Sequence, residues 1–110
     1  MCQFQSLYQN KNGYVVKCNM CGHYQLGFAS FMLTLLRNDF TTLCETVAKK
    51  LTSVNHDENE NYKCILIPTI YQGVNILLTG PELHQLHTML EDADVEEKTQ
   101  SLISLFNIQN

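Results

Sequence analysis

The chain changes twice from the two-residue period of β-strands to the longer period of an amphipathic helix. β-prone runs joined by short loops fill residues 3–36, and residues 39–51 then carry apolar side chains three or four positions apart. The polar connector 54–61 follows, after which β-prone runs return at 63–78 and a second helical pattern starts near Pro81. Pairs of strands followed by helices predict an α+β fold with a mainly antiparallel sheet built from β-hairpins.

The first two β-prone runs flank a polar loop of Asn, Lys and Gly residues, which predicts a hairpin. One register of this hairpin pairs Tyr8 with Gly13. That register places Cys2 opposite Asn19, and a slip of one residue places Cys2 opposite Met20. In either register, Cys2 comes to the C-x-x-C turn that follows the hairpin.

About three helices are expected to cover one face of this sheet. The first carries its apolar stripe over 39–51, and the second starts at Pro81, whose fixed φ suits a first helical turn. Asp94 is predicted to cap a third helix, with Glu97 completing a capping-box pair. The side chains of the third helix that we expect to face the core are Val95, Thr99, Leu102 and Phe106, with Ile103 and Leu105 as further candidates.

The two halves of the chain, 1–53 and 62–110, show the same order of strands and helix. A shift of 43 residues places Glu82 on Asp39 and aligns apolar positions of the two helical patterns. Either a degenerate ββα duplication or convergent patterning of apolar residues produces such a match. In both cases the chain has the length of one domain, and residues 1–110 are expected to form a single α+β unit.

Charge and hydropathy exclude several classes of partner. The net charge is −4 and only 16% of the residues are charged, so the sequence predicts neither nucleic acid nor an anionic membrane as a partner. The start of the chain has no basic segment followed by an apolar one, and no apolar run approaches the ~20 residues of a membrane helix. We therefore expect a cytoplasmic protein.

The chain contains five cysteines, which in the reducing cytosol are expected to be thiols or metal ligands and not a disulfide framework. Cys18 and Cys21 form a C-x-x-C turn, and Gly22 permits the tight backbone in which amides donate hydrogen bonds to the sulfurs. This pattern is typical of one half of a tetrahedral zinc site. The predicted hairpin adds Cys2 as a third ligand.

The fourth ligand of such a zinc site is predicted to be Cys64, at the start of a later strand, with His23 or a water molecule as alternatives. Zinc is the one cofactor that the sequence indicates. Two other interpretations remain open: a redox-active C-x-x-C pair, or small thiols with no shared role. A redox pair uses the dipole of a following helix to lower the first thiol's pKa, but a β-like segment follows Gly22. Cys44 lies in an apolar helical stripe and is expected to be a core thiol.

Several N-terminal segments together resemble a small bacterial family of domains of unknown function. They are Cys2, residues 12–14, the turn 18–22 and residues 25–28, and the resemblance is clearest over 2–44. It implies a compact cytoplasmic protein without an assigned activity, and it favours treating the three N-terminal cysteines as a set. It supplies no catalytic residue.

Nothing in the sequence identifies a substrate or a reaction, since phosphate-binding, dinucleotide-binding and nucleophile-elbow motifs are all missing. The class that we favour is a non-catalytic binding or regulatory accessory module with a protein partner, in which zinc would be structural. The edges of an antiparallel sheet make a homodimer one alternative. The second hypothesis is a thiol-redox or metal-dependent enzyme that uses Cys18 and Cys21.

Overall fold

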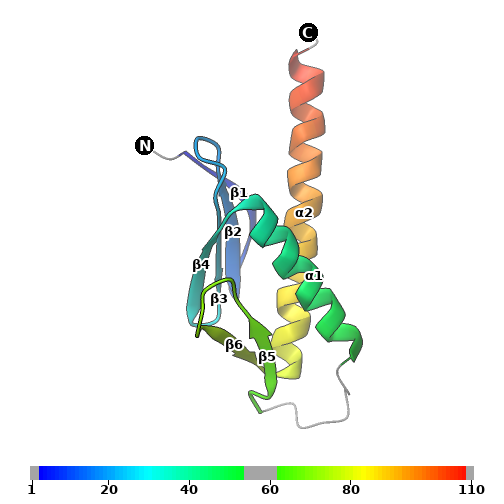
Figure 1. Ribbon diagram of the computed structural model, residues 1–110. Helices are drawn as coiled ribbons and strands as arrows, with labels where there is room; N and C mark the ends of the chain where they lie inside the picture. The colour runs from blue at the N-terminus through cyan, green and yellow to red at the C-terminus, as the bar shows by residue number, and fades with distance from the viewer. Residues whose placement is uncertain (1–2, 54–61, 109–110) are drawn as a thin grey trace.

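The computed structural model describes residues 3–53 and 62–108. These residues form strands and helices in two sheets and a helical layer (Figure 1). In chain order the elements are β1 (Phe4–Asn10), β2 (Gly13–Cys18), β3 (Tyr24–Phe28), β4 (Phe31–Leu35), α1 (Arg37–Ser53), β5 (Ile65–Pro68), β6 (Asn75–Leu78) and α2 (Gly80–Ile108). All the strand pairs are antiparallel, which confirms an α+β fold built from hairpins.

The main sheet contains β1, β2, β3 and β4 in chain order. Its first hairpin has one irregularity, just before Tyr8, where the register shifts. Tyr8 pairs with Val15, so the predicted pairing of Tyr8 with Gly13 is wrong. Phe4 pairs with Cys18, in the register that has the one-residue slip. The first residue of β1 therefore lies beside Cys18, the start of the C-x-x-C turn.

The β1–β2 turn is shorter than the sequence suggests because a side chain closes it. The Oδ1 atom of Asn10 accepts hydrogen bonds from the backbone N–H groups of Asn12, at 2.8 Å, and Gly13, at 3.1 Å. Asn10 pairs with Gly13, which leaves a two-residue loop. Gly13 also passes close to β3: a Cβ atom there would lie 2.1 Å from the carbonyl oxygen of Gly27. By accepting these two backbone hydrogen bonds, the Asn10 side chain closes the turn and fixes the pairing of β1 with β2 next to it.

Both helices pack on the same face of the main sheet, as predicted (Figure 1). Tyr24 of β3 points into this layer, where its ring stacks on Phe40 of α1 with 4.5 Å between the ring centroids. Its hydroxyl group reaches Glu97 of α2. Strands and helices together enclose one core of fully or nearly fully buried apolar side chains. Within the described residues no helix is long and apolar enough to cross a bilayer.

The helix α2 is continuous where the sequence predicts two helices, so the prediction of about three helices is wrong for the part of the chain described. Asp94 lies inside α2, and its carboxylate forms an ion pair with Lys98 at 2.9 Å, one helical turn further on. No Gly or Pro interrupts the chain between Leu90 and Val95. The residues that were expected to bring a third helix onto the core are exposed: Val95, Thr99, Leu102, Ile103, Leu105 and Phe106.

The hairpin in the second half of the chain, β5 with β6, forms a two-stranded sheet of its own and does not extend the main sheet. Ile70 and Tyr71, predicted to be in a strand, lie in the connection between β5 and β6. The Tyr71 hydroxyl donates a hydrogen bond to the backbone carbonyl of Thr34, at 2.7 Å. This contact ties the small sheet to β4, the edge strand of the main sheet.

Candidate functional site

The C-x-x-C turn connects β2 to β3 through a tight, hydrogen-bonded loop. The Cys18 N–H donates to the His23 carbonyl at 2.8 Å, and the Gly22 N–H donates to the Cys18 carbonyl at 2.9 Å. Gly22 has a φ of +76°, a left-handed conformation that disfavours residues with a side chain. Cys18 is fully buried, whereas Cys21 is exposed. The glycine thus allows the chain to reverse within the motif, as the sequence predicts.

The side chains of this turn contact one another. The Cys21 N–H donates a hydrogen bond to the Cys18 Sγ atom at 3.4 Å. The Nδ1 atom of His23 lies 3.0 Å from the Cys21 Sγ atom. An amide directed at the first sulfur, followed by a glycine with positive φ, is the local arrangement of a zinc knuckle. Cys18, Cys21 and His23 are residue types that bind zinc and all belong to this turn, but as placed here their side chains do not form a three-ligand group.

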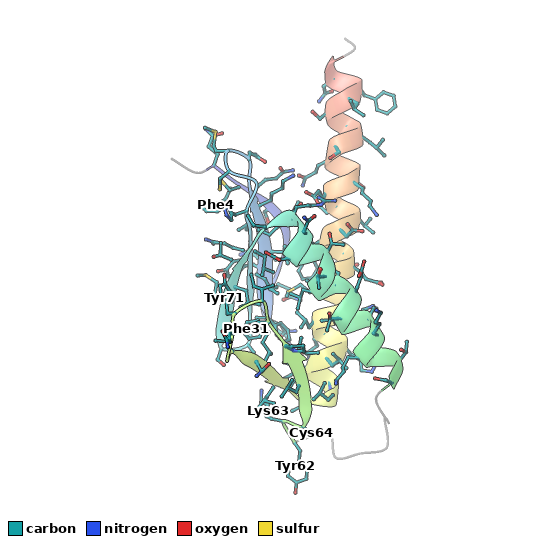
Figure 2. The ribbon with its side chains drawn as sticks, in the orientation of Figure 1. Phe4, Phe31, Tyr62, Lys63, Cys64 and Tyr71 are labelled. Carbon is teal, nitrogen blue, oxygen red and sulfur yellow. The ribbon has the colours of Figure 1, made fainter. Side chains whose placement is uncertain are left out.

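The two other predicted zinc ligands are Cys2 and Cys64, and the structure describes only Cys64. Cys2 lies outside the described residues; its neighbour Gln3 accepts a hydrogen bond from the Asn19 N–H through its carbonyl, at 2.8 Å. Cys64 lies just before β5, at the end of the molecule opposite Phe4, the strand partner of Cys18 (Figure 2). The structure therefore does not bring Cys64 to the turn. Across residues 3–53 and 62–108, no three His, Cys, Asp or Glu side chains form a group that could hold a metal ion.

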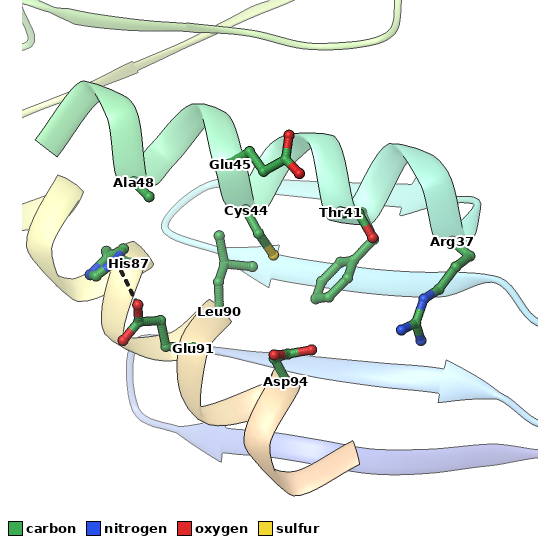
Figure 3. A pocket seen from close by; sticks show the side chains of 10 residues that line it. Arg37, Thr41, Cys44, Glu45, Ala48, His87, Leu90, Glu91 and Asp94 are labelled. Carbon is green, nitrogen blue, oxygen red and sulfur yellow. Dashed lines mark ion pairs between the residues drawn. The ribbon is translucent and has the colours of Figure 1, made fainter. Parts of the chain in front are cut away.

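A cleft of about 270 Å³ lies between α1 and α2, with an apolar floor and a charged rim (Figure 3). Its floor includes Cys44, and its rim includes the ion pair of His87 Nε2 with Glu91 Oε1, at 3.1 Å. Burial, with a smaller contribution from the negative charge of Asp94, raises the pKa of Cys44 to about 11. A thiol with this pKa stays protonated at neutral pH and is a poor nucleophile or metal ligand. The cleft therefore offers shape and apolar contact, and its thiol is not activated.

The sequence predicts Glu97 as the capping-box partner of Asp94, and this prediction is wrong because both residues lie inside α2. The carboxylate of Glu97 instead belongs to a polar cluster that the sequence analysis missed. Glu97 is only 7% exposed, and its carboxylate accepts a hydrogen bond from the Tyr24 hydroxyl at 2.6 Å. Lys17 and Arg37 each form an ion pair with it at 2.9 Å. Arg37 also donates to the Tyr24 hydroxyl at 2.5 Å. These four residues join β2, β3, α1 and α2 at one point.

The protonation of this group follows from its partners. Burial by itself would raise the pKa of the Glu97 carboxyl, but hydrogen bonds from Tyr24 and Lys17, and the positive charges of Lys17 and Arg37, outweigh burial and lower it. Burial and the Glu97 carboxylate raise the pKa of Tyr24 to about 12. Glu97 is therefore charged and Tyr24 neutral at neutral pH. A signal was present in the sequence: Glu97 continues the helical spacing of Leu90 and Ala93 on the core face.

Comparison with known proteins identifies the family of this chain. A family model described as a family of unknown function (DUF6686) matches residues 1–110, so the chain belongs to that family. No curated protein and no solved structure matches the chain.

Proposed function

We propose that this member of DUF6686 is a non-catalytic binding module, and that a zinc ion at the C-x-x-C turn fixes the end of its main sheet. The geometry of the turn carries the zinc part of the proposal: an amide aimed at the Cys18 sulfur, Gly22 with positive φ, and His23 in contact with Cys21. The proposed ligands are Cys18, Cys21 and Cys2; the residue that follows Cys2 in the sequence is Gln3, whose backbone carbonyl accepts a hydrogen bond from the Asn19 N–H. His23 is proposed as the fourth ligand.

Two observations support binding over catalysis. The segment after the turn is the strand β3, and not the helix that follows the C-x-x-C pair in disulfide oxidoreductases. The thiol at the α1–α2 cleft, Cys44, has a pKa raised to about 11. Structural zinc sites use four protein ligands, whereas catalytic sites keep one position for water. With His23 as fourth ligand, the proposed site is closed.

The zinc proposal predicts about one zinc per chain in protein purified without chelators or metal-binding tags, measured by elemental analysis. The exposed Cys21 makes Cys21→Ser a mild change for packing, and we expect it to lower the zinc content to below about a tenth per chain. Cys2→Ser is expected to do the same. The matched controls are Cys44→Ser and Cys64→Ser, which should keep the metal because neither residue lies at the turn.

A count of native thiols in the same sample separates the two functions. With zinc bound, the cysteines of the turn are expected to react slowly with a thiol reagent, and chelation should expose them. Cys44 should stay slow in both samples because burial keeps its thiol protonated. A metal-free protein whose Cys21 reacts at once would contradict the zinc site and support the second candidate, a thiol-redox enzyme. Loss of zinc in Cys64→Ser would contradict the proposed ligand set.

A further inference from the structure

The helix α2 has two apolar faces that lie in different parts of its length. Its first half buries Leu83, Leu86, Leu90 and Ala93 against the core. From Glu97 onward the same face becomes polar, and every residue from 101 to 107 is exposed. Gln100 still donates a hydrogen bond to the Ser6 carbonyl of β1, and beyond it the red end of α2 stands clear of the sheet and of α1 (Figure 1).

A second set of apolar residues follows the opposite face of α2 and is exposed, outside the core and the residues packed against it. Val95, Thr99, Leu102 and Phe106 are spaced by four, three and four residues, and they lie about half a helical turn around from the core face. We call these four residues the back stripe. Its three large side chains are 61%, 58% and 68% exposed, in the order Val95, Leu102 and Phe106. Ile103 and Leu105, beside the stripe, are also more than half exposed.

The spacing of the back stripe is that of a helix-pairing seam. Apolar residues that alternate between three and four positions are the a and d positions of a coiled coil, where each side chain inserts between residues of a facing helix. A solvent-facing helix surface carries charged and polar residues at these positions. Exposed apolar residues that are contiguous, and not scattered singly over the surface, are typical of interaction sites. The stripe therefore has the pattern of a surface that is covered by another helix.

The distribution of charge indicates which helix covers it. Residues 99–110 include no charged side chain, whereas Asp94, Glu96 and Lys98 lie at the other end of the stripe. Two copies of α2 that pair antiparallel place the charged end of each stripe opposite the uncharged end of the other. A parallel pair would instead bring the two charged ends side by side, and acidic residues outnumber Lys98 there, so the two ends would repel each other. The back stripe itself contains no charged side chain, so it does not favour a charged partner.

We propose that the back stripe is a homodimer interface, in which the projecting ends of two α2 helices pair antiparallel about a two-fold axis. One isologous contact then covers both stripes. The inference adds a partner to the proposed binding role and does not depend on zinc. Because two short helix ends bury less than the ~1,600 Å² of a standard interface, we expect a dimer that dissociates on dilution in the micromolar range.

Sedimentation equilibrium between about 5 and 500 µM tests this interface in the wild-type chain. The mass is expected to rise from that of one 12.6 kDa chain to twice that value. Leu102→Glu should remain monomeric over the range, and Phe106→Glu should do likewise. Ser104→Glu is the matched control: it adds the same charge at an exposed position on the opposite face of the helix, and it should dimerise as the wild type does.

Two results would overturn the proposal. A wild-type chain that is monomeric at the highest concentration would exclude a second copy as the occupant and leave the stripe to a different protein. A dimer that Leu102→Glu does not weaken would exclude the back stripe as the interface. All the substituted residues are exposed, so circular dichroism should show unchanged folding. Zinc content measured on the same samples keeps failure of the dimer distinct from failure of the zinc site.

Discussion

Replacing Leu86 with Ala is expected to lower the free energy of unfolding by about 3 kcal/mol. Leu86 is 0% exposed, on the core face of α2, and truncating it leaves a cavity between the helix and the sheets. A domain of this size has a total stability of roughly 5–15 kcal/mol, so the loss is a large part of it. Urea denaturation followed by circular dichroism measures the change as a shift of the midpoint at constant slope.

Leu105→Ala is the matched control for this prediction. It makes the same chemical change on the same helix, but Leu105 is 58% exposed, in the half of α2 that stands clear of the sheet. The expected change in unfolding free energy is within about 0.5 kcal/mol. Equal losses in Leu86→Ala and Leu105→Ala would contradict the division of α2 into a core half and a projecting half.

Replacing Glu97 with Ala is expected to destabilise the fold by about 2–3 kcal/mol. The substitution leaves the buried Tyr24 hydroxyl without its acceptor, and it removes the shared anion of Lys17 and Arg37. Removing one partner of a fully buried ion pair costs about 3–5 kcal/mol, but Lys17 and Arg37 are partly exposed and can regain water. Glu96→Ala, at the exposed neighbouring position, is the control and should cost under about 0.5 kcal/mol.

The contribution of Glu97 is also expected to depend on pH, with a sign that follows from its lowered pKa. Near its ordinary pKa of 4.5, the carboxyl binds more protons in the unfolded chain than in the folded chain. Its stabilising effect is therefore complete above that pH and is lost as the pH falls through the folded-state value. The stability difference between wild type and Glu97→Gln should be constant between about pH 6 and 7 and shrink below about pH 4.5. A difference that grows on acidification would contradict the assignment.

Local signals in the sequence were sufficient for much of the fold. Alternation of polar and apolar residues located the first hairpins, and the change of period located both helices. The 43-residue shift also relates the observed elements, because β4 and β6 end at Leu35 and Leu78 and α1 and α2 begin at Arg37 and Gly80. The error in the first hairpin arose because one side chain decides its geometry. Asn10 closes the first turn and thereby changes the register.

The continuous α2 was missed for a different physical reason. The apolar residues of α2 lie on one side of the helix before Glu97 and on the opposite side after it. Such a change is typical of two separate helices that each pack on the core. The chain contains no breaker there, so the helix continues and carries its second face into solvent. In the candidate zinc site, the spacing of Cys18 and Cys21 predicted the turn, but no sequence pattern could show that Cys64 lies at the other end of the molecule.

The most direct test of the division of α2 into a core half and an interface half is amide hydrogen exchange across α2 at two protein concentrations. In a dimer, amides of residues 101–107 should be protected at about 500 µM and lose protection on dilution to about 5 µM, while amides around Leu86 stay protected at both. Exchange of residues 101–107 that is fast and independent of concentration would contradict the claim that the back stripe is covered by a second copy.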